Sequence, residues 1–206
     1  MTDLVADSVW PGLIGWTLLY VSDYALTVQG ARLYRKYAQE KFVREGSYEL
    51  TPYFQKDIDR LRAISPRFLF ALAWGVLVLV FVWWMARRAG WEEVYVFVLG
   101  ALVVSELAIH VRHVASLFTF HAARDDNAIL GQIKYSRAFS LRMSSINMFA
   151  FAGMFAVVFA FTQSWFVLGG AARCLYLALE HRDLRRNHLL GAAKKTEAAS
   201  GGSANA

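Results

Sequence analysis

The stretch FLFALAWGVLVLVFVWWM, residues 68–85, contains no charged residue and no strongly polar one. A helix of about 20 such residues is long enough to cross the ~30 Å hydrocarbon core of a bilayer. Ser65 and Pro66 precede the stretch, in the order typical of a helix N-cap and a first-turn proline. The stretch therefore predicts a membrane-spanning helix over 67–88 and places the chain among integral membrane proteins.

Further apolar segments lie on both sides of this helix. The chain is 57% hydrophobic and 18% charged, whereas an ordinary soluble domain is about 25% charged. The sequence therefore predicts an all-α fold, a polytopic membrane helix bundle that forms a single membrane domain over residues 1–190. Its five predicted transmembrane helices cover residues 9–30, 67–88, 93–120, 137–162 and 165–182.

Two regions are predicted to lie outside the bilayer. Residues 31–66 form a cytoplasmic helical segment, in which the first helix continues to about Val43. An amphipathic helix of about three turns, PYFQKDIDRLRAI (52–64), then lies at the membrane surface or packs on its neighbours. Residues 191–206 are mostly Ala, Gly, Ser and Lys, and this composition predicts a disordered tail.

The distribution of Lys and Arg predicts the orientation of the chain. Basic residues are concentrated in 31–66, in the loop before 137 and in the C-terminal tail. Cytoplasmic loops of membrane proteins carry an excess of Lys and Arg, and five spans place all three regions on one side. We therefore expect a plasma (inner) membrane protein with the N-terminus outside and the C-terminus in the cytoplasm.

The same reasoning restricts the partners. The net charge of +6 is explained by the basic residues that set the orientation of the chain in the membrane. No nucleic-acid-binding motif is visible, so a nucleic-acid partner is not expected. Five helices are few to enclose a complete path across the membrane, so we expect the chain to assemble with other chains. The lipid bilayer is one expected partner, and a second copy of the chain (a homo-oligomer) or another membrane protein is the other.

The third span carries ionisable residues where lipid-facing side chains are expected. In VSELAIHVRHVASLFTF, residues 104–120, Glu106, His110 and His113 follow the i, i+4, i+7 spacing of one helix face. Asp23 on the first span lies in the same half of the bilayer. These four residues form the candidate site for an ion or for protons, and a divalent metal ion is the cofactor that they would hold.

Polar residues of other spans lie at a similar depth: Arg142, Ser144 and Asn147 on the fourth and Arg173 on the fifth. An ionised group at the centre of a membrane helix costs about 2.5–3.5 kcal/mol. These groups must therefore pair, become neutral or line a water-filled cavity open to the cytoplasm. The structural alternative is that Asp23 or Glu106 pairs with an arginine and only sets the register of the bundle.

These features favour transport or conduction of a small ion or solute, linked to protons or cations, over catalysis. One alternative is a membrane-embedded metalloenzyme, although the H-E-x-x-H motif and the Glu-x-x-His pairs of di-iron bundles are absent from the sequence. A haem site is disfavoured, because two histidines three apart on one helix cannot occupy opposite axial positions. The other alternative is a non-catalytic scaffold or assembly subunit that works through 31–66.

Overall fold

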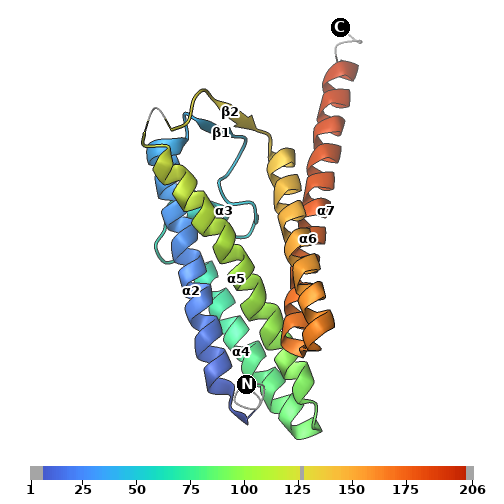
Figure 1. Cartoon of the computed structure of the whole chain (residues 1–206). Coiled ribbons are helices and arrows are strands. Elements are labelled where there is room, and N and C mark those ends of the chain that lie inside the picture. The colour runs from blue at the N-terminus through green and yellow to red at the C-terminus, as the bar shows by residue number, and fades with distance from the viewer. Residues whose placement is uncertain (1–6, 126–127, 203–206) are drawn as a thin grey trace.

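A computed structural model describes residues 7–125 and 128–202 of the chain. Long helices run alternately up and down the molecule (Figure 1), and the fold is all-α apart from two three-residue strands. The long helices are α2 (Val9–Leu33), α4 (Pro66–Ala89), α5 (Glu92–Ala122), α6 (Arg137–Thr162) and α7 (Trp165–Gly202). The short elements are η1 (Tyr34–Ala38), β1 (Phe42–Arg44), α3 (Gln55–Asp59) and β2 (Ile133–Tyr135).

Local sequence signals mark the ends of these helices. The Ser65 hydroxyl accepts a hydrogen bond from the Phe68 backbone N–H at 3.0 Å, and Pro66 occupies the first turn of α4. Gly90 ends α4 in the left-handed conformation, with φ 70°. Gln163, with φ 51°, separates α6 from α7. Helices α4 and α6 therefore begin and end within one or two residues of the bounds predicted for the second and fourth spans.

Three of the described helices, α4, α5 and α6, are long and apolar enough to cross a membrane. Large apolar side chains such as Phe70, Trp74 and Phe81 are exposed along α4, as expected for a lipid-facing surface. Helices α2 and α7 are not among the three. Asp23 interrupts the apolar sequence of α2, and Arg173 and Glu180 interrupt that of α7. The total of five spans therefore remains a prediction.

The prediction that the first helix continues to Val43 was wrong. A π-helical turn, η1, ends at Ala38, and residues 42–44 form β1, which pairs in parallel with β2. The Phe42 ring lies 6.4 Å from both the Phe120 and the Tyr135 rings, measured between centroids. The chain turns back over the bundle because this burial of Phe42 is favourable, whereas a continued helix would leave it in water.

The predicted three-turn amphipathic helix was also wrong, because α3 has only five residues. Leu61, in the left-handed region with φ 51°, ends the helical conformation, and Arg62 folds back to pair with Asp57 at 3.0 Å. Ile58 is buried in a cluster that includes Tyr24 of α2 and Phe68 of α4. The apolar face of this segment therefore packs on protein instead of on lipid.

Helix α7 continues through Gly202, beyond residue 190, where composition predicted that the ordered chain would end. Ala, Lys and Glu in this part are strong helix formers, which explains the helical conformation. Residues 203–206 of the predicted tail lie outside the described residues.

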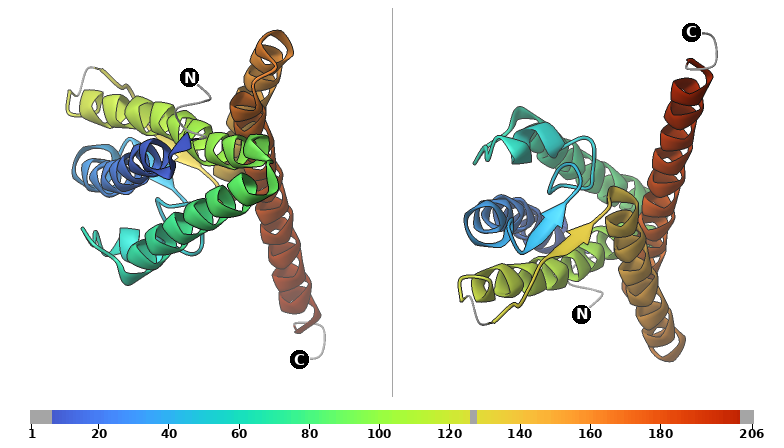
Figure 2. Two further views of the ribbon diagram at one scale, coloured as in Figure 1. Left: turned by 90° about the horizontal axis from the view of Figure 1, so that it is seen from below. Right: turned by 90° about the horizontal axis from the view of Figure 1, so that it is seen from above.

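The helices form two groups. Helices α2, α4 and α5 enclose an apolar core that includes Trp16, Leu79 and Leu99. Helices α6 and α7 form a hairpin that joins this group through α5, and both lean away from α2 and α4 toward the end carrying β1 and β2 (Figures 1 and 2). We call residues 39–65, which cross that end of the molecule, the cap.

Candidate functional site

A cavity of about 650 Å³ lies where the two groups of helices diverge, next to the cap. Helices α2, α5, α6 and α7 and the cap all contribute side chains to it, whereas α4 contributes only Phe68. The charged and histidine side chains of the lining are Asp23, Arg44, Glu49, Glu106, Arg112, His113, Arg173, Glu180 and His181.

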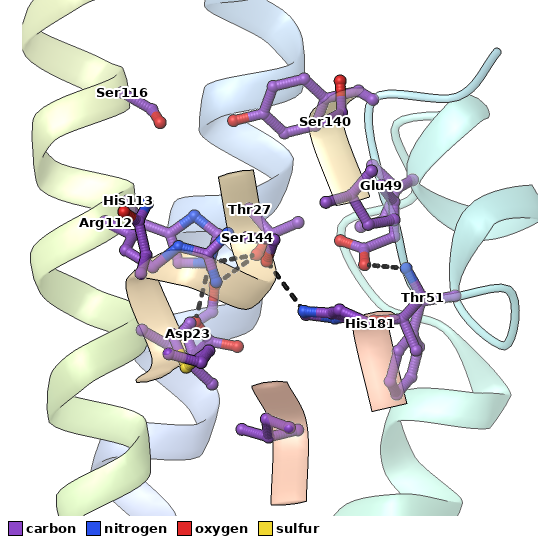
Figure 3. Close-up of a pocket in the computed structure, with 18 of the residues that line it drawn as sticks. Asp23, Thr27, Glu49, Thr51, Arg112, His113, Ser116, Ser140, Ser144 and His181 are labelled. Atoms are coloured by element: carbon purple, nitrogen blue, oxygen red, sulfur yellow. Dashed lines mark hydrogen bonds and ion pairs between the residues drawn. The ribbon is translucent and has the colours of Figure 1, made fainter. Parts of the chain in front are cut away.

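Polar side chains of α2 and α5 meet along one wall of the cavity. His113 Nε2 lies 3.0 Å from Asp23 Oδ1 and 3.2 Å from Thr27 Oγ1, and Figure 3 shows His113 pointing from α5 toward these two α2 residues. Slightly further from the cap, His110 Nε2 lies 2.7 Å from Ser22 Oγ. The two helices are therefore joined by side-chain contacts between polar groups, in addition to apolar packing.

Glu106, in the same wall, has a carboxylate oxygen without a partner within the described chain. Glu106 Oε2 is buried, and among the described residues it has no hydrogen-bond partner. A buried acceptor without a partner costs roughly 1–3 kcal/mol. The arrangement therefore favours a bound proton, cation or water at Glu106.

The opposite wall, formed by α6 and α7, is held by hydrogen bonds of its own. Ser144 Oγ lies 2.9 Å from His181 Nδ1, a contact drawn in Figure 3, and Ser145 donates to the Ala178 carbonyl at 2.7 Å. Asn147 of α6 and Arg173 of α7 also line the cavity. Both walls can therefore offer donors and acceptors to one solute.

The cap covers the cavity with a carboxyl group and an arginine. Glu49 Oε1 accepts a hydrogen bond from the Thr51 backbone N–H at 2.7 Å (Figure 3), and burial raises the pKa of Glu49. Burial also raises the pKa of Tyr48 to about 12. The Arg44 guanidinium lies 5.2 Å from the Tyr48 ring centroid and 5.8 Å from that of Phe120, in cation–π contact.

Most of the residues proposed from sequence come together at this cavity. Its lining includes Asp23, Glu106, His113, Ser144, Asn147 and Arg173. His110 is not part of the lining. Its ring instead contacts Ser22 of α2.

The assignment of Arg142 to the polar cavity was wrong. Arg142 is exposed and does not line the cavity. It is two positions, or about 200°, from both Ser140 and Ser144 on α6, and both of these residues line the cavity. Arg142 is therefore on the opposite face of the helix.

If Asp23 or Glu106 served only to set the register of the bundle, it would pair with Arg142 or Arg173. Asp23 pairs with His113, and neither Asp23 nor Glu106 forms a salt bridge to Arg142 or Arg173 within the described part of the chain. The carboxylates therefore do not serve as simple partners for these two arginines.

Several lining residues were not assigned to the site from sequence, chiefly Arg112, Glu180, His181 and the cap residues Arg44 and Glu49. Arg112 has a signal in the sequence, since it lies between His110 and His113 in an apolar helix. The cap residues have none, because they lie in an irregular segment without periodicity.

No protein-family model matches this sequence, and neither a curated protein nor a solved structure shows significant similarity to it.

Proposed function

We propose that the protein is a five-span membrane transporter for a small cation or cationic solute, with the cavity facing the cytoplasm. The observation that carries this proposal is the pair of carboxylates, Asp23 and Glu106, brought from two helices into the wall of one large cavity. Ionisable groups within membrane helices face interiors or aqueous cavities and commonly mark ion pathways.

The packing supports gated transport over open conduction. The apolar core that includes Trp16, Tyr95 and Leu99 lies on the side of the cavity away from the cap. A cation that enters beside the cap would meet this packed layer, so passage requires a conformational change. We propose that the α6–α7 hairpin moves against α2, α4 and α5, because close backbone contacts between the two groups, such as that of Gly100 with Phe166, lie away from the cap, where the groups diverge.

A flux assay tests this function directly. Purified protein in vesicles of phosphatidylethanolamine and phosphatidylglycerol should carry at least one of K⁺, H⁺ and Mn²⁺, each followed by an encapsulated fluorescent reporter. Glu106→Gln should reduce the flux about 10- to 100-fold, because it removes charge at nearly constant shape.

The matched control is Glu93→Gln, the same substitution on the same helix but at an exposed position outside the cavity. It should keep the wild-type rate. Absence of flux for all three cations, or equal rates in Glu106→Gln and wild type, would overturn the proposed function.

A membrane metalloenzyme is the second candidate. It is favoured by one observation: Asp23, Glu106 and His110 each offer a ligand atom, and these atoms lie within 4.8 Å of one another. A catalytic metal centre keeps an open coordination position, and two of these residues line the cavity. One equivalent of metal retained through purification, without flux, would favour this candidate.

A further inference from the structure

Three potential metal ligands converge between α2 and α5. Asp23 comes from α2, and Glu106 and His110 come from α5, where a spacing of four residues places both on neighbouring positions of one face. The candidate ligand atoms of the three lie within 4.8 Å of one another. Small side-chain rotations would bring all three to about 2.0–2.2 Å from one ion.

The surroundings of His110 favour the tautomer in which Nε2 can bind a metal ion. Its Nδ1 lies 2.7 Å from the Glu106 backbone carbonyl oxygen, which can only accept, so Nδ1 carries the proton. Neutral His110 therefore presents a lone pair at Nε2. A metal-binding histidine commonly has its second ring nitrogen fixed by a carbonyl in this way.

Ser22 lies against this nitrogen. Its oxygen is 2.9 Å from the Leu19 carbonyl oxygen and 2.7 Å from His110 Nε2, and its one proton can be donated to either of them. With the proton on the Leu19 side, the Ser22 oxygen and His110 Nε2 both present lone pairs, at a separation similar to the roughly 3 Å between adjacent ligands of one metal ion.

The two carboxylates are placed to complete such a site. Glu106 Oε2 is buried without a hydrogen-bond partner in the described chain. Asp23 is held from its other side by His113, whose Nε2 is 3.0 Å from Oδ1, so its orientation is fixed while one oxygen remains for a metal.

We propose that Asp23, Glu106 and His110 bind one divalent first-row transition-metal ion, with Ser22 as an additional ligand. An imidazole favours Zn²⁺, Fe²⁺ or Mn²⁺ over Mg²⁺ and Ca²⁺, and none of the three residues is a cysteine, whose thiolate would favour Cu⁺. Since Asp23 and Glu106 line the cavity, the remaining coordination positions face it and allow exchange. This proposal rests on the proposed function only where it identifies the bound metal ion with the transported cation.

Direct binding tests the site without transport. Tag-free protein in detergent, stripped with EDTA, is titrated with Zn²⁺ and with Mn²⁺, and bound metal is counted by elemental analysis. We expect about one ion per chain, which millimolar Mg²⁺ does not displace. Glu106→Gln and His110→Ala should each lower the affinity by about 10- to 100-fold or more. Glu93→Gln, on the same helix as Glu106 but exposed and outside the cavity, should retain the wild-type affinity.

Wild-type protein provides a second readout that does not depend on the folding of a variant. Pulsed EPR of the Mn²⁺-loaded protein should show coupling to a directly bound ¹⁴N nucleus of imidazole. Folded wild type that binds neither metal below millimolar concentration, or binding that the two ligand variants leave unchanged, would overturn the site. A proton held by His110 in place of a metal would give the first of these results.

The outcomes for site and function are distinguishable. Stoichiometric metal binding without flux of any cation retains the site and rejects the transporter. Flux of K⁺ or H⁺ without metal binding retains the transporter and rejects the metal site.

Discussion

Single residues show how burial changes the chemistry of this molecule away from the bilayer. Glu49 lies in the cap, and burial raises its pKa, whereas a hydrogen bond from the Thr51 backbone N–H acts in the opposite direction. A carboxyl group whose pKa is higher in the folded state contributes most to stability below its unfolded pKa of about 4.3. That contribution is lost as the pH rises toward the folded pKa, because folding then requires either uptake of a proton or burial of the charge.

We therefore predict that Glu49→Gln becomes increasingly more stable than wild type as the pH rises. The amide keeps an acceptor for the Thr51 N–H, so the two proteins should differ by less than about 0.5 kcal/mol at pH 4. At pH 8 the variant should unfold at the higher temperature, as followed by thermal unfolding in detergent. Glu40→Gln, at an exposed cap position, should show no such pH-dependent difference. A Glu49→Gln protein that is less stable at pH 8 would mean that the native carboxylate is charged and paired.

At the scale of elements, the contact between α5 and α7 depends on glycine. A Cβ at Gly100 would collide with the backbone of Phe166, and a Cβ at Gly169 would collide with the backbone of Phe97. Small residues allow membrane helices to approach at backbone distance. A Cβ at Gly170 would likewise collide with the Val104 side chain of α5.

Gly100→Ala and Gly169→Ala should each destabilise the protein by about 1–3 kcal/mol, because the backbones must separate. Gly153→Ala is the control. This glycine lies inside α6 with open space around it, so alanine should be neutral or stabilising by up to about 1 kcal/mol. Thermal unfolding in detergent measures all three, and equal melting temperatures for the two classes would contradict the close packing.

At the scale of the whole molecule, the alternation of the helices places the basic regions together. The cap, the segment around β2 and the C-terminal half of α7 lie at one end, and the turns at Gly90 and Gln163 lie at the other (Figure 1). Because positively charged loops commonly remain on the cytoplasmic side, this is the end that we expect to face the cytoplasm.

We predict that the termini lie on opposite sides of the membrane. In a Cys174→Ala background, cysteines introduced by Leu130→Cys and Ser203→Cys should react with an impermeant thiol reagent only from the cytoplasmic side. A cysteine introduced by Thr2→Cys should react only from outside. Leu130 is a suitable reporter because its side chain is 85% exposed. Labelling of positions 2 and 203 from the same side would contradict five spans.

The sequence by itself determined the all-α class, the ends of α4 and α6, and a polar face on α5. These features depend on local quantities, namely the length of an apolar run, a capping serine, a left-handed glycine and a spacing of three or four residues. The approach of Asp23 to His113 was expected only as a shared depth in the bilayer, since sequence periodicity does not show which helices are neighbours.

The tertiary structure alone decided the rest. It placed His110 against Ser22 and Arg142 on the outer face of α6, and it brought Arg112 and Glu49 into the cavity. It also folded the cap, where Phe42 meets Phe120 and β1 meets β2 across about 90 residues of sequence. Helix formation is governed by near neighbours along the chain, whereas the cap and the cavity exist only because distant segments bury one another, and no local pattern encodes that burial.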